Sequence, residues 1–352
     1  MLREAPALHA ASARLLRNFW GNQAMSENYA LEPFVSLIIP AYNAEHFLQT
    51  SVQSCLEQTH KNLEILIIDD GSTDSTLKLA QELAQNNTRI KVFAQSQNSG
   101  TFAARARGIE ESKGDFVAFV DADDWIEPEF CAQMVAAIMR KGDFANATAD
   151  FAVCHYFLGD LPKIRVFDNK VAGTRIVNWA CLYRRALLLQ ALSLCVRIFG
   201  EIPHGLFSGE DTLMGLLLIS FVRDCSVVNA PLYHYTQHDE STTHSAALRS
   251  KRLQNAALCF DLGKTLQAHP AWNPSFPIRE FARITNNMAI YEFYILQRHT
   301  DCVIMLQSEQ QSRLSRLSPY LAALLCARRY HWRWRNDLRI ALYCLSFGAV
   351  KR

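Results

Sequence analysis

The sequence predicts an α/β protein with a mostly parallel central sheet flanked by helices and a helical extension at the C-terminus. Between Phe34 and Phe130, short apolar runs alternate with amphipathic ones, which is the pattern of β-α-β units. Each apolar run there ends in polar residues, as expected where a strand leaves a sheet. From about Ala246 onward the pattern instead indicates helices, joined by the proline-bearing segment HPAWNPSFPIR.

The strands expected in the first part are FVSLIIP, LEILIID, IKVFAQ and DFVAFV. Helices are predicted at AEHFLQTSVQSCLEQ, whose apolar residues share one helical face, and at TLKLAQELAQ and GTFAARARGIEES. Ser72, Thr73 or Asp74 can cap the second of these helices. Beyond Phe130 we expect a helix to about Arg140 and short strands at DFAVCHYF and KIRVFD, followed by NWACLYRRALLLQAL.

The composition is that of an ordinary globular protein. With 352 residues, 49% of them hydrophobic, the chain can form one large domain and an appendage. We expect an N-terminal leader or helical extension over residues 1–33, an α/β domain over 34–245 and a C-terminal helical region over 246–352. The formal charge of +2 gives no reason to expect nucleic-acid binding.

The cysteines and apolar runs indicate a cytoplasmic protein. The ten cysteines include no CxxC pair, and no clean secretory leader precedes Phe34, so free thiols in a reducing cytosol are expected. Met25 is an alternative start to Met1. The apolar run Leu213–Val222 is shorter than the roughly 18 residues that a membrane span needs.

Polar residues follow three of the expected strands at their C-terminal ends: Pro40 to Asn43, Asp69 with Asp70, and Asp121 to Asp124. In an open parallel sheet the ligand crevice lies outside the carboxyl ends of the strands, because loops from neighbouring strands converge there. We therefore expect these three groups to meet around one ligand.

The acids in GDFVAFVDADDWIEP have two interpretations. Carboxylates spaced D-x-D after a strand can hold a divalent cation, Mn²⁺ or Mg²⁺, whose other positions are shared with substrate phosphates. Alternatively, Asp123 or Asp124 caps the turn before WIEPEF. The second acidic strand end, at Asp69 and Asp70, favours the metal.

Two further groups of polar residues, one of acids and one of histidines, each have two interpretations. Glu210 and Asp211 follow Gly209 and precede an apolar helical run, where they either present a carboxylate to a cleft or cap the helix. His234 and His238 are four residues apart, with His244 nearby, which is a possible zinc spacing. No cysteine or carboxylate set completes a zinc site convincingly, and the tyrosines beside His234 favour a strand edge.

These segments, in order and spacing, resemble the family 2 glycosyltransferases of bacterial surface-polysaccharide type. The matching segments are VSLIIPAYNAEHFL, EILIIDDGSTDST, NSGTFAARARGI, GDFVAFVDADDWIEP, LYRRALL, GEDTLMG and PLYHYTQHDEST, across about Phe34 to Thr243. The resemblance implies the GT-A fold, a Rossmann-like α/β architecture. It also implies a nucleotide-sugar-binding half over residues 34–130 and an acceptor half over 131–245.

By the same resemblance, donor-binding residues would be Pro40, Tyr42, Asn43, Asp70, Asn98, Gly100, Arg105 and Asp121. The first three would line the nucleobase pocket, and Asp70 would accept a hydrogen bond from the base. Asp121 and Asp123 would serve the donor ribose and the metal-bound diphosphate, with His234 a further contact to metal or phosphate. Asp211 would be the general base, with Glu210 as its alternate.

Local alternatives stay open for several of these residues. Tyr42 can be a half-buried aromatic at a strand end, Asp69 a turn acceptor, and Arg105 with Arg107 solvated helix charges. The chain also departs from the family at Ala106, where many members have asparagine. That departure removes one hydrogen bond near the diphosphate or sugar, although Arg105 can still pair with phosphate.

The implied reaction is the inverting transfer of a sugar from a UDP-linked donor to a lipopolysaccharide, capsule or related glycan. The basic segment ARRYHWRWRNDLRIALYCLSFGAVKR would lie on the inner face of the plasma membrane and meet a lipid-linked acceptor, or else pack on the domain or an oligomer partner. One alternative function is a sugar nucleotidyltransferase, although PAYNAEHF lacks the glycine-rich basic loop that such enzymes need. Another is a non-catalytic glycan-assembly protein, which the intact GED argues against.

Overall fold

The computed structural model describes residues 32–139, 149–159, 161–163, 178–207, 210–219 and 221–236, with the single positions 255, 258, 261, 262 and 265. By its internal contacts Pro33–Arg352 forms one unit, separate from Met1–Glu32. The expected N-terminal extension up to Leu31 therefore lies outside the described residues. So do the basic tail and, apart from the single positions, the expected C-terminal helices.

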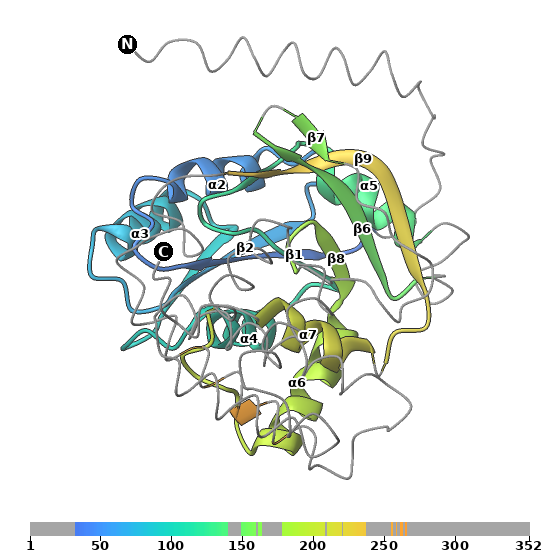
Figure 1. Ribbon diagram of the computed structural model, residues 1–352. Helices are drawn as coiled ribbons and strands as arrows, with labels where there is room; N and C mark the ends of the chain where they lie inside the picture. The colour runs from blue at the N-terminus through green and yellow to red at the C-terminus, as the bar shows by residue number, and fades with distance from the viewer. Residues whose placement is uncertain are drawn as a thin grey trace, which may run out of the picture. The chain divides into compact units, whose positions relative to one another are not determined.

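Strands and helices alternate in the first half, as the apolar and amphipathic runs predict (Figure 1). The strands are β1 (Val35–Ala41), β2 (Leu63–Asp69), β3 (Ile90–Ala94) and β4 (Phe116–Phe119). The helices between them are α2 (Leu48–Leu56), α3 (Thr76–Asn86) and α4 (Thr101–Glu111). The α/β prediction is confirmed.

The described residues after β4 add further strands and three helices to this framework. They are β5 (Trp125–Ile126), α5 (Phe130–Ile138), β6 (Phe151–Leu158), β7 (Leu161–Lys163), β8 (Cys181–Arg184), α6 (Arg185–Phe199), α7 (Glu210–Ile219) and β9 (Cys225–Tyr235). Of the strand expected at KIRVFD, Lys163 ends β7 and the remainder lies outside the described residues.

The described strands form one mixed sheet in the order β3-β2-β1-β4-β8-β6-β9-β5, with β7 paired to β6. The pairs β3–β2, β2–β1 and β1–β4 are parallel, whereas β8 runs antiparallel to both β4 and β6. The chain leaves β1 toward β2 and β3 and then returns to β4 on the other side of β1. A ligand crevice is expected at this switch point, outside the carboxyl ends of β1 and β4.

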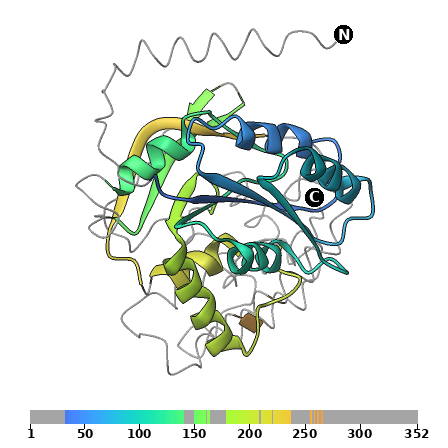
Figure 2. The ribbon, with the colours of Figure 1, turned by 180° about the vertical axis from the view of Figure 1, so that it is seen from behind.

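Alternation along the strands divides the buried side chains between two cores. Val35, Leu37 and Ile39 of β1 face one side, where they pack with residues of α2, α3 and α5. Ile38 faces the other side, toward residues of α4, α6 and α7. Figures 1 and 2 accordingly show α2 and α3 on one side of the sheet and α4, α6 and α7 on the other.

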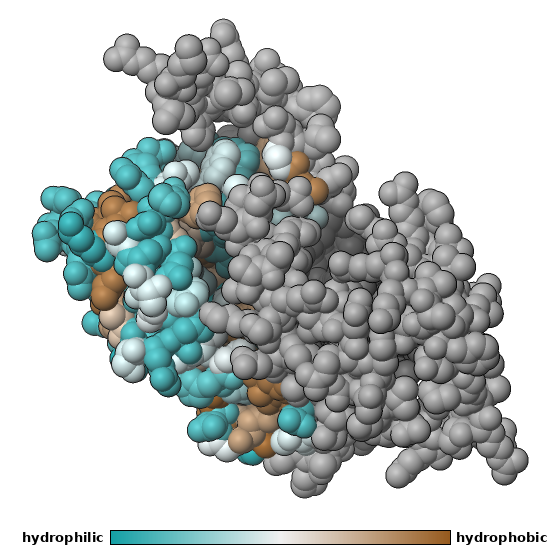
Figure 3. Space-filling model, turned by 60° about the vertical axis from the view of Figure 1, so that its left-hand side comes forward, coloured by the Kyte–Doolittle hydropathy of each residue, from teal (hydrophilic) through white to brown (hydrophobic). Residues whose placement is uncertain are grey.

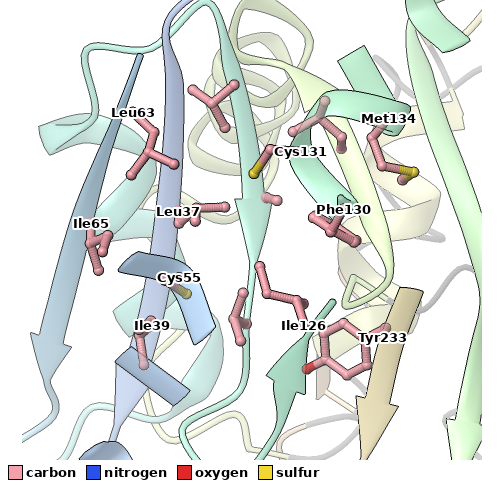
Figure 4. Packing of buried hydrophobic residues seen from close by; sticks show 14 of the residues in the cluster. Leu37, Ile39, Cys55, Leu63, Ile65, Ile126, Phe130, Cys131, Met134 and Tyr233 are labelled. Atoms are coloured by element: carbon pink, nitrogen blue, oxygen red, sulfur yellow. The ribbon is translucent and has the colours of Figure 1, made fainter. Parts of the chain in front are cut away.

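Figure 4 shows part of the first core, in which Leu37 and Ile39 of β1 lie beside Leu63 and Ile65 of β2. Further along, residues of α5 and Tyr233 of β9 continue the same cluster, so one core spans both halves of the sheet. This continuity holds the carboxyl end of β4 in a fixed position relative to β9, because buried side chains pack closely and resist displacement.

One face of the described residues is mainly hydrophilic (Figure 3) and their cysteines are free, as expected from the sequence. On the face shown in Figure 3, the coloured residues are mainly hydrophilic, with hydrophobic ones in separate groups. Among the described helices, none has the length and hydrophobicity needed to cross a membrane. The six cysteines in the described part of the chain are free thiols, as expected.

Candidate active site

The loops after β1 and β2 meet through Asn43. The backbone N–H of Asn43 donates to Ser72 Oγ at 3.0 Å, and its Oδ1 accepts from the backbone N–H of Thr73 at 2.9 Å. Asn43 has a φ of 49°, a left-handed conformation that asparagine tolerates better than most residues. Next to it, Tyr42 is 37% exposed and lies at the surface beside these loops.

Asp70, at the end of β2, organises the loop that precedes α4. Its Oδ1 accepts from Ser99 N–H at 2.7 Å and from Gln95 Nε2 at 2.9 Å, and its Oδ2 accepts from Gly100 N–H at 2.8 Å. Burial raises the pKa of Asp70, although the two backbone N–H groups act to lower it. Asp70 thus has a structural task that the sequence did not indicate, and its contact with a nucleobase stays a prediction.

Asp69, the residue before Asp70, is fully buried. Asp69 Oδ2 accepts from Ser72 N–H at 3.3 Å, which is the local turn contact considered above. The other oxygen, Oδ1, is buried without a hydrogen bond among the described residues.

Gly100 allows the chain before α7 to approach α4 closely. It has a φ of 90°, and an added Cβ would lie 2.6 Å from the backbone N of Leu206. Around it, Gly205 N–H donates to Ser99 O at 2.6 Å and Phe102 N–H donates to Leu206 O at 3.1 Å. The resulting contact brings the start of α7 beside α4. Asn98, the first residue of this loop motif, is exposed.

Arg105 of α4 is the residue that joins the acidic motifs. Its Nη2 donates to Asp121 Oδ1 at 2.7 Å, and its Nη1 donates to Asp211 Oδ1 at 3.0 Å and to Glu210 Oε1 at 3.3 Å. The side chain is only 2% exposed. The interpretation of Arg105 as a solvated helix charge is therefore wrong, because α4 turns this residue inward to three carboxylates. Arg107, at 51% exposure and paired with Glu111, does fit that interpretation.

Glu210 and Asp211 begin α7 and differ in their surroundings. Asp211 Oδ1 accepts from Arg105 and also from the backbone N–H of Asn178, at 3.1 Å. Burial and the adjacent charge of Asp211 raise the pKa of Glu210 to about 8, against the opposing effect of Arg105. At neutral pH Glu210 is therefore mostly protonated, which leaves Asp211 as the candidate proton acceptor.

The DADD loop divides its acids between two tasks. Asp124 is buried and accepts hydrogen bonds from Tyr233 Oη at 2.7 Å and from Thr236 N–H at 2.8 Å. Burial and the charges of Asp121 and Asp123 raise the pKa of Asp124 well above its ordinary value. Asp124 thus attaches the loop to β9, and the expected ligand contacts of the loop fall on the half-buried Asp121 and Asp123.

Asp121 and Asp123 have the chemistry to share a divalent cation. Within the described residues, no group of three or more histidine, cysteine or acidic side chains is arranged as a metal site. Mg²⁺ is commonly held in proteins by one or two carboxylates, with substrate phosphates and water as the other oxygen ligands. Asp121 meets Arg105 through Oδ1, which leaves Oδ2 for a cation.

His234 of β9 lies in an aromatic stack. Its ring stacks on Trp125 and Phe157, with centroid distances of 3.2 and 4.3 Å, and its Nε2 lies 2.7 Å from Glu127 Oε1. Because β9 lies between β6 and β5, and His234 pairs with Phe157 on one side and Trp125 on the other, the strand-edge interpretation is wrong. A contact of His234 with metal or phosphate stays a prediction. The other two histidines of the possible zinc spacing, His238 and His244, lie outside the described residues.

Two site residues were not predicted. Asn178 supplies the backbone N–H to Asp211, and Tyr233 joins the DADD loop to β9 by accepting from Asp121 N–H at 3.1 Å and donating to Asp124. Neither residue has a local motif. Only the tyrosine's position in PLYHYTQHDEST, within the segment expected near the diphosphate, could have drawn attention to it.

Comparison with known sequences finds related glycosyltransferases. The profile described as Glycosyl transferase family 2 matches residues 36–176. An uncharacterized glycosyltransferase of Haemophilus influenzae is 42% identical over 232 residues, which cover 65% of this chain and 87% of that protein. The "Putative glycosyltransferase EpsH" of Bacillus subtilis is 35% identical over 58% of this chain. That match covers 61% of EpsH, less than two thirds of its length.

Solved structures share the fold at low sequence identity. Staphylococcus aureus TarS 1–349, in complex with UDP-GlcNAc, aligns with a TM-score of 0.54 at 19% identity and covers 83% of this chain and 80% of its own. The mannosyltransferase PcManGT of Pyrobaculum calidifontis, in complex with GDP-Man and Mn²⁺, aligns with a TM-score of 0.53 at 14% identity over 97% of this chain and 96% of its own. The GT-A fold is thereby confirmed.

Proposed function

Because the chain belongs to glycosyl transferase family 2, we propose that it transfers a sugar from a UDP-linked donor to a hydroxyl of a bacterial surface glycan, with inversion at the anomeric carbon. One observation carries the proposal. The guanidinium group of Arg105 contacts both Asp121 and Asp211, so the expected donor-binding loop and the expected general base flank one space. Residues 34–130 would bind the donor and residues 131–245 the acceptor.

The donor would lie across the carboxyl ends of β1, β2 and β4. Pro40, Tyr42 and Asn43 would line the nucleobase pocket, with the exposed ring of Tyr42 packing against the base. Asp70 would accept a hydrogen bond from the imide N–H of uracil. Because Asp70 also accepts from the backbone N–H groups of Ser99 and Gly100, it would hold the Asn98–Gly100 loop beside the base. The UDP-GlcNAc complex of the TarS neighbour supports a uridine donor.

Asp121 and Asp123 would hold a divalent cation together with the diphosphate, and Asp121 would also serve the donor ribose. When bound, Mn²⁺ or Mg²⁺ neutralises charge on the leaving diphosphate. The carboxylates around Arg105 outnumber its single positive charge, and such an excess of negative charge attracts a cation. The Mn²⁺ present with PcManGT supports this choice of metal.

Asp211 would take the proton of the acceptor hydroxyl as that oxygen attacks the anomeric carbon in a single displacement. Arg105 and the Asn178 N–H both donate to Oδ1, which fixes the orientation of the carboxylate that the acceptor hydroxyl would meet. Glu210, mostly protonated at neutral pH, would reduce the repulsion between neighbouring acids. The acceptor would be lipopolysaccharide, capsule or a related glycan, met at the inner face of the plasma membrane.

Titration calorimetry with UDP tests the donor half of the proposal. The full chain should bind UDP more tightly with Mn²⁺ than with EDTA. Asp211→Asn should keep the Kd for UDP within about twofold, because Asp211 acts on the acceptor. If UDP binds neither with Mn²⁺ nor with EDTA, the donor assignment is wrong.

UDP release tests the chemical half. With a panel of UDP-sugars and extracted surface glycan, the wild type should release UDP, and Asp211→Asn should slow release by about 10²- to 10⁴-fold, the usual contribution of a general base. Glu210→Gln is the matched control on the same turn of α7 and should retain most of the rate. Full activity of Asp211→Asn would remove its assigned role.

A further inference from the structure

A group of aromatic side chains beside the acids has no task in the scheme above. Trp179 stacks on Tyr235 with ring centroids 5.4 Å apart, lies 5.1 Å from Tyr233, and meets Tyr156 edge-on at 4.9 Å. Trp179, Tyr235 and Tyr156 are each partly exposed. By contrast Tyr183, which stacks on Phe151 within the second core, is fully buried.

This aromatic group lies between the two sets of carboxylates. Trp179 directly follows Asn178, whose backbone N–H donates to Asp211. On its other side, Trp179 packs on Tyr233, which is hydrogen-bonded to the DADD loop.

A backbone contact gives the same location for Tyr235. The residue that follows it, Thr236, donates its backbone N–H to Asp124 Oδ1 at 2.8 Å. Tyr235 therefore lies next to the DADD loop, whose acids would hold the metal and diphosphate. A backbone bridge between Trp179 and Phe119, two residues before Asp121, fixes Trp179 at the same end of β4.

We propose that Trp179 and Tyr235 form a stacking subsite for a sugar ring of the acceptor, next to the hydroxyl that Asp211 activates. The inference rests on the proposed function and adds the chemical class of the group bound there, a pyranose instead of a lipid or an acyclic polyol. A pyranose has an apolar face of C–H groups and a polar rim. Tryptophan and tyrosine match it, because each combines a flat apolar body with one polar group.

The neighbouring Asn178 fits such a ligand. Its side chain is 0% exposed, and neither its Oδ1 nor its Nδ2 has a hydrogen-bond partner among the described residues. A buried amide without a partner is costly, and in native structures it calls for an explanation. A small rearrangement on binding would let a sugar hydroxyl satisfy this amide beside Trp179.

Saturation-transfer NMR on the full chain with UDP and Mn²⁺ tests the subsite directly. The probes are the methyl glycosides of glucose, galactose, mannose and N-acetylglucosamine. At least one should bind, with saturation concentrated on its ring C–H protons. If none of them binds to the wild type, the inference is overturned.

Paired variants then separate stacking from simple packing. Trp179→Phe should keep the Kd of the bound glycoside within about threefold, whereas Trp179→Leu should raise it by about three- to tenfold, as the loss of an aromatic contact predicts. Trp125→Leu, which removes the tryptophan stacked on His234, is the control and should leave this Kd unchanged. Equal affinities of the Trp179→Phe and Trp179→Leu variants would overturn the inference.

Tyr235→Phe and Tyr235→Leu repeat the comparison should Trp179→Leu lose its fold, as judged by thermal melting. The same samples are titrated with UDP. If UDP binds but glycoside affinity is insensitive to both aromatic positions, the subsite alone is refuted. If UDP does not bind, the proposed donor chemistry fails, whatever the glycosides do.

Discussion

Arg105 and Asp121 are joined by a hydrogen-bonded ion pair of 2.7 Å between helix α4 and the end of strand β4. The same guanidinium group reaches Asp211 at 3.0 Å, so one buried cation links acids that are far apart in the sequence. A buried charge is tolerated when it is paired and hydrogen-bonded, and here Arg105 pairs with the carboxylates of Asp121 and Asp211. Glu210, whose pKa is raised to about 8, is a third contact at 3.3 Å. The position of the candidate base relative to the DADD loop therefore depends on Arg105.

Replacing Arg105 should destabilise the protein strongly. Arg105→Met leaves Asp121 and Asp211 without their buried counter-charge, and breaking a buried pair in this way costs about 3–5 kcal/mol. Arg107→Met is the matched control on the same helix, because its exposed pair with Glu111 contributes about 0.5 kcal/mol or less. Urea unfolding measures both losses. Similar losses for the two variants would contradict the central role of Arg105.

The pH dependence of stability should carry a signature of Glu210. Its pKa rises from the ordinary 4.5 to about 8 on folding, so between these values the folded protein holds a proton that the unfolded chain releases. The free energy of unfolding should therefore fall as pH rises from about 5 to 8, by at most about 1.4 kcal/mol per pH unit from this group.

Glu210→Gln cannot titrate and should lose that part of the slope. Urea unfolding of both proteins at a series of pH values gives the difference directly, because the other titrating groups are common to both. Parallel curves for wild type and variant would show that Glu210 is ionised in the folded protein at neutral pH.

Gly100 should tolerate alanine less well than another glycine with positive φ. Gly200, at φ 85°, ends α6 and has open space where a Cβ would be, so Gly200→Ala should cost only the left-handed strain, about 1–2 kcal/mol. Gly100→Ala adds a Cβ that overlaps the backbone of Leu206, which should cost at least about 2 kcal/mol more. Thermal unfolding compares them, and equal costs would show that the Leu206 segment moves freely.

Replacing Asp124 should affect the stability of the protein, whereas replacing Asp123 should affect the Mn²⁺ dependence of UDP binding. Asp124→Ala leaves the Tyr233 hydroxyl and the Thr236 N–H without their acceptor, which should lower the free energy of unfolding by about 1–3 kcal/mol. Asp123→Ala should lower stability by less than Asp124→Ala does, because Asp123 is half-buried and Asp124 is buried. It should, however, abolish the gain in UDP affinity on adding Mn²⁺. An unchanged Mn²⁺ effect would exclude Asp123 as a ligand.

Local sequence was sufficient for the first half of the fold, and it gave the strand ends at which the candidate site is expected. Apolar runs such as FVSLIIP and LEILIID were predicted as strands and form β1 and β2, since a buried parallel strand needs nearly continuous apolar residues. The position of Asp70 and Asp121 at strand ends followed from the same pattern. Parallel strands share one carboxyl edge, so their convergence required no knowledge of side-chain packing.

Long-range contacts account for what the sequence left open. Helical periodicity places Arg105 on the same face of α4 as Phe102 and Ile109. It does not identify the partners of Arg105, because the acids that surround it come from the end of β4 and the start of α7. Asp124 likewise looks like a turn residue until β9 brings Tyr233 to it. Spacing along the chain reports which face of an element is buried, whereas the partner of a buried charge depends on which distant segments the fold brings together.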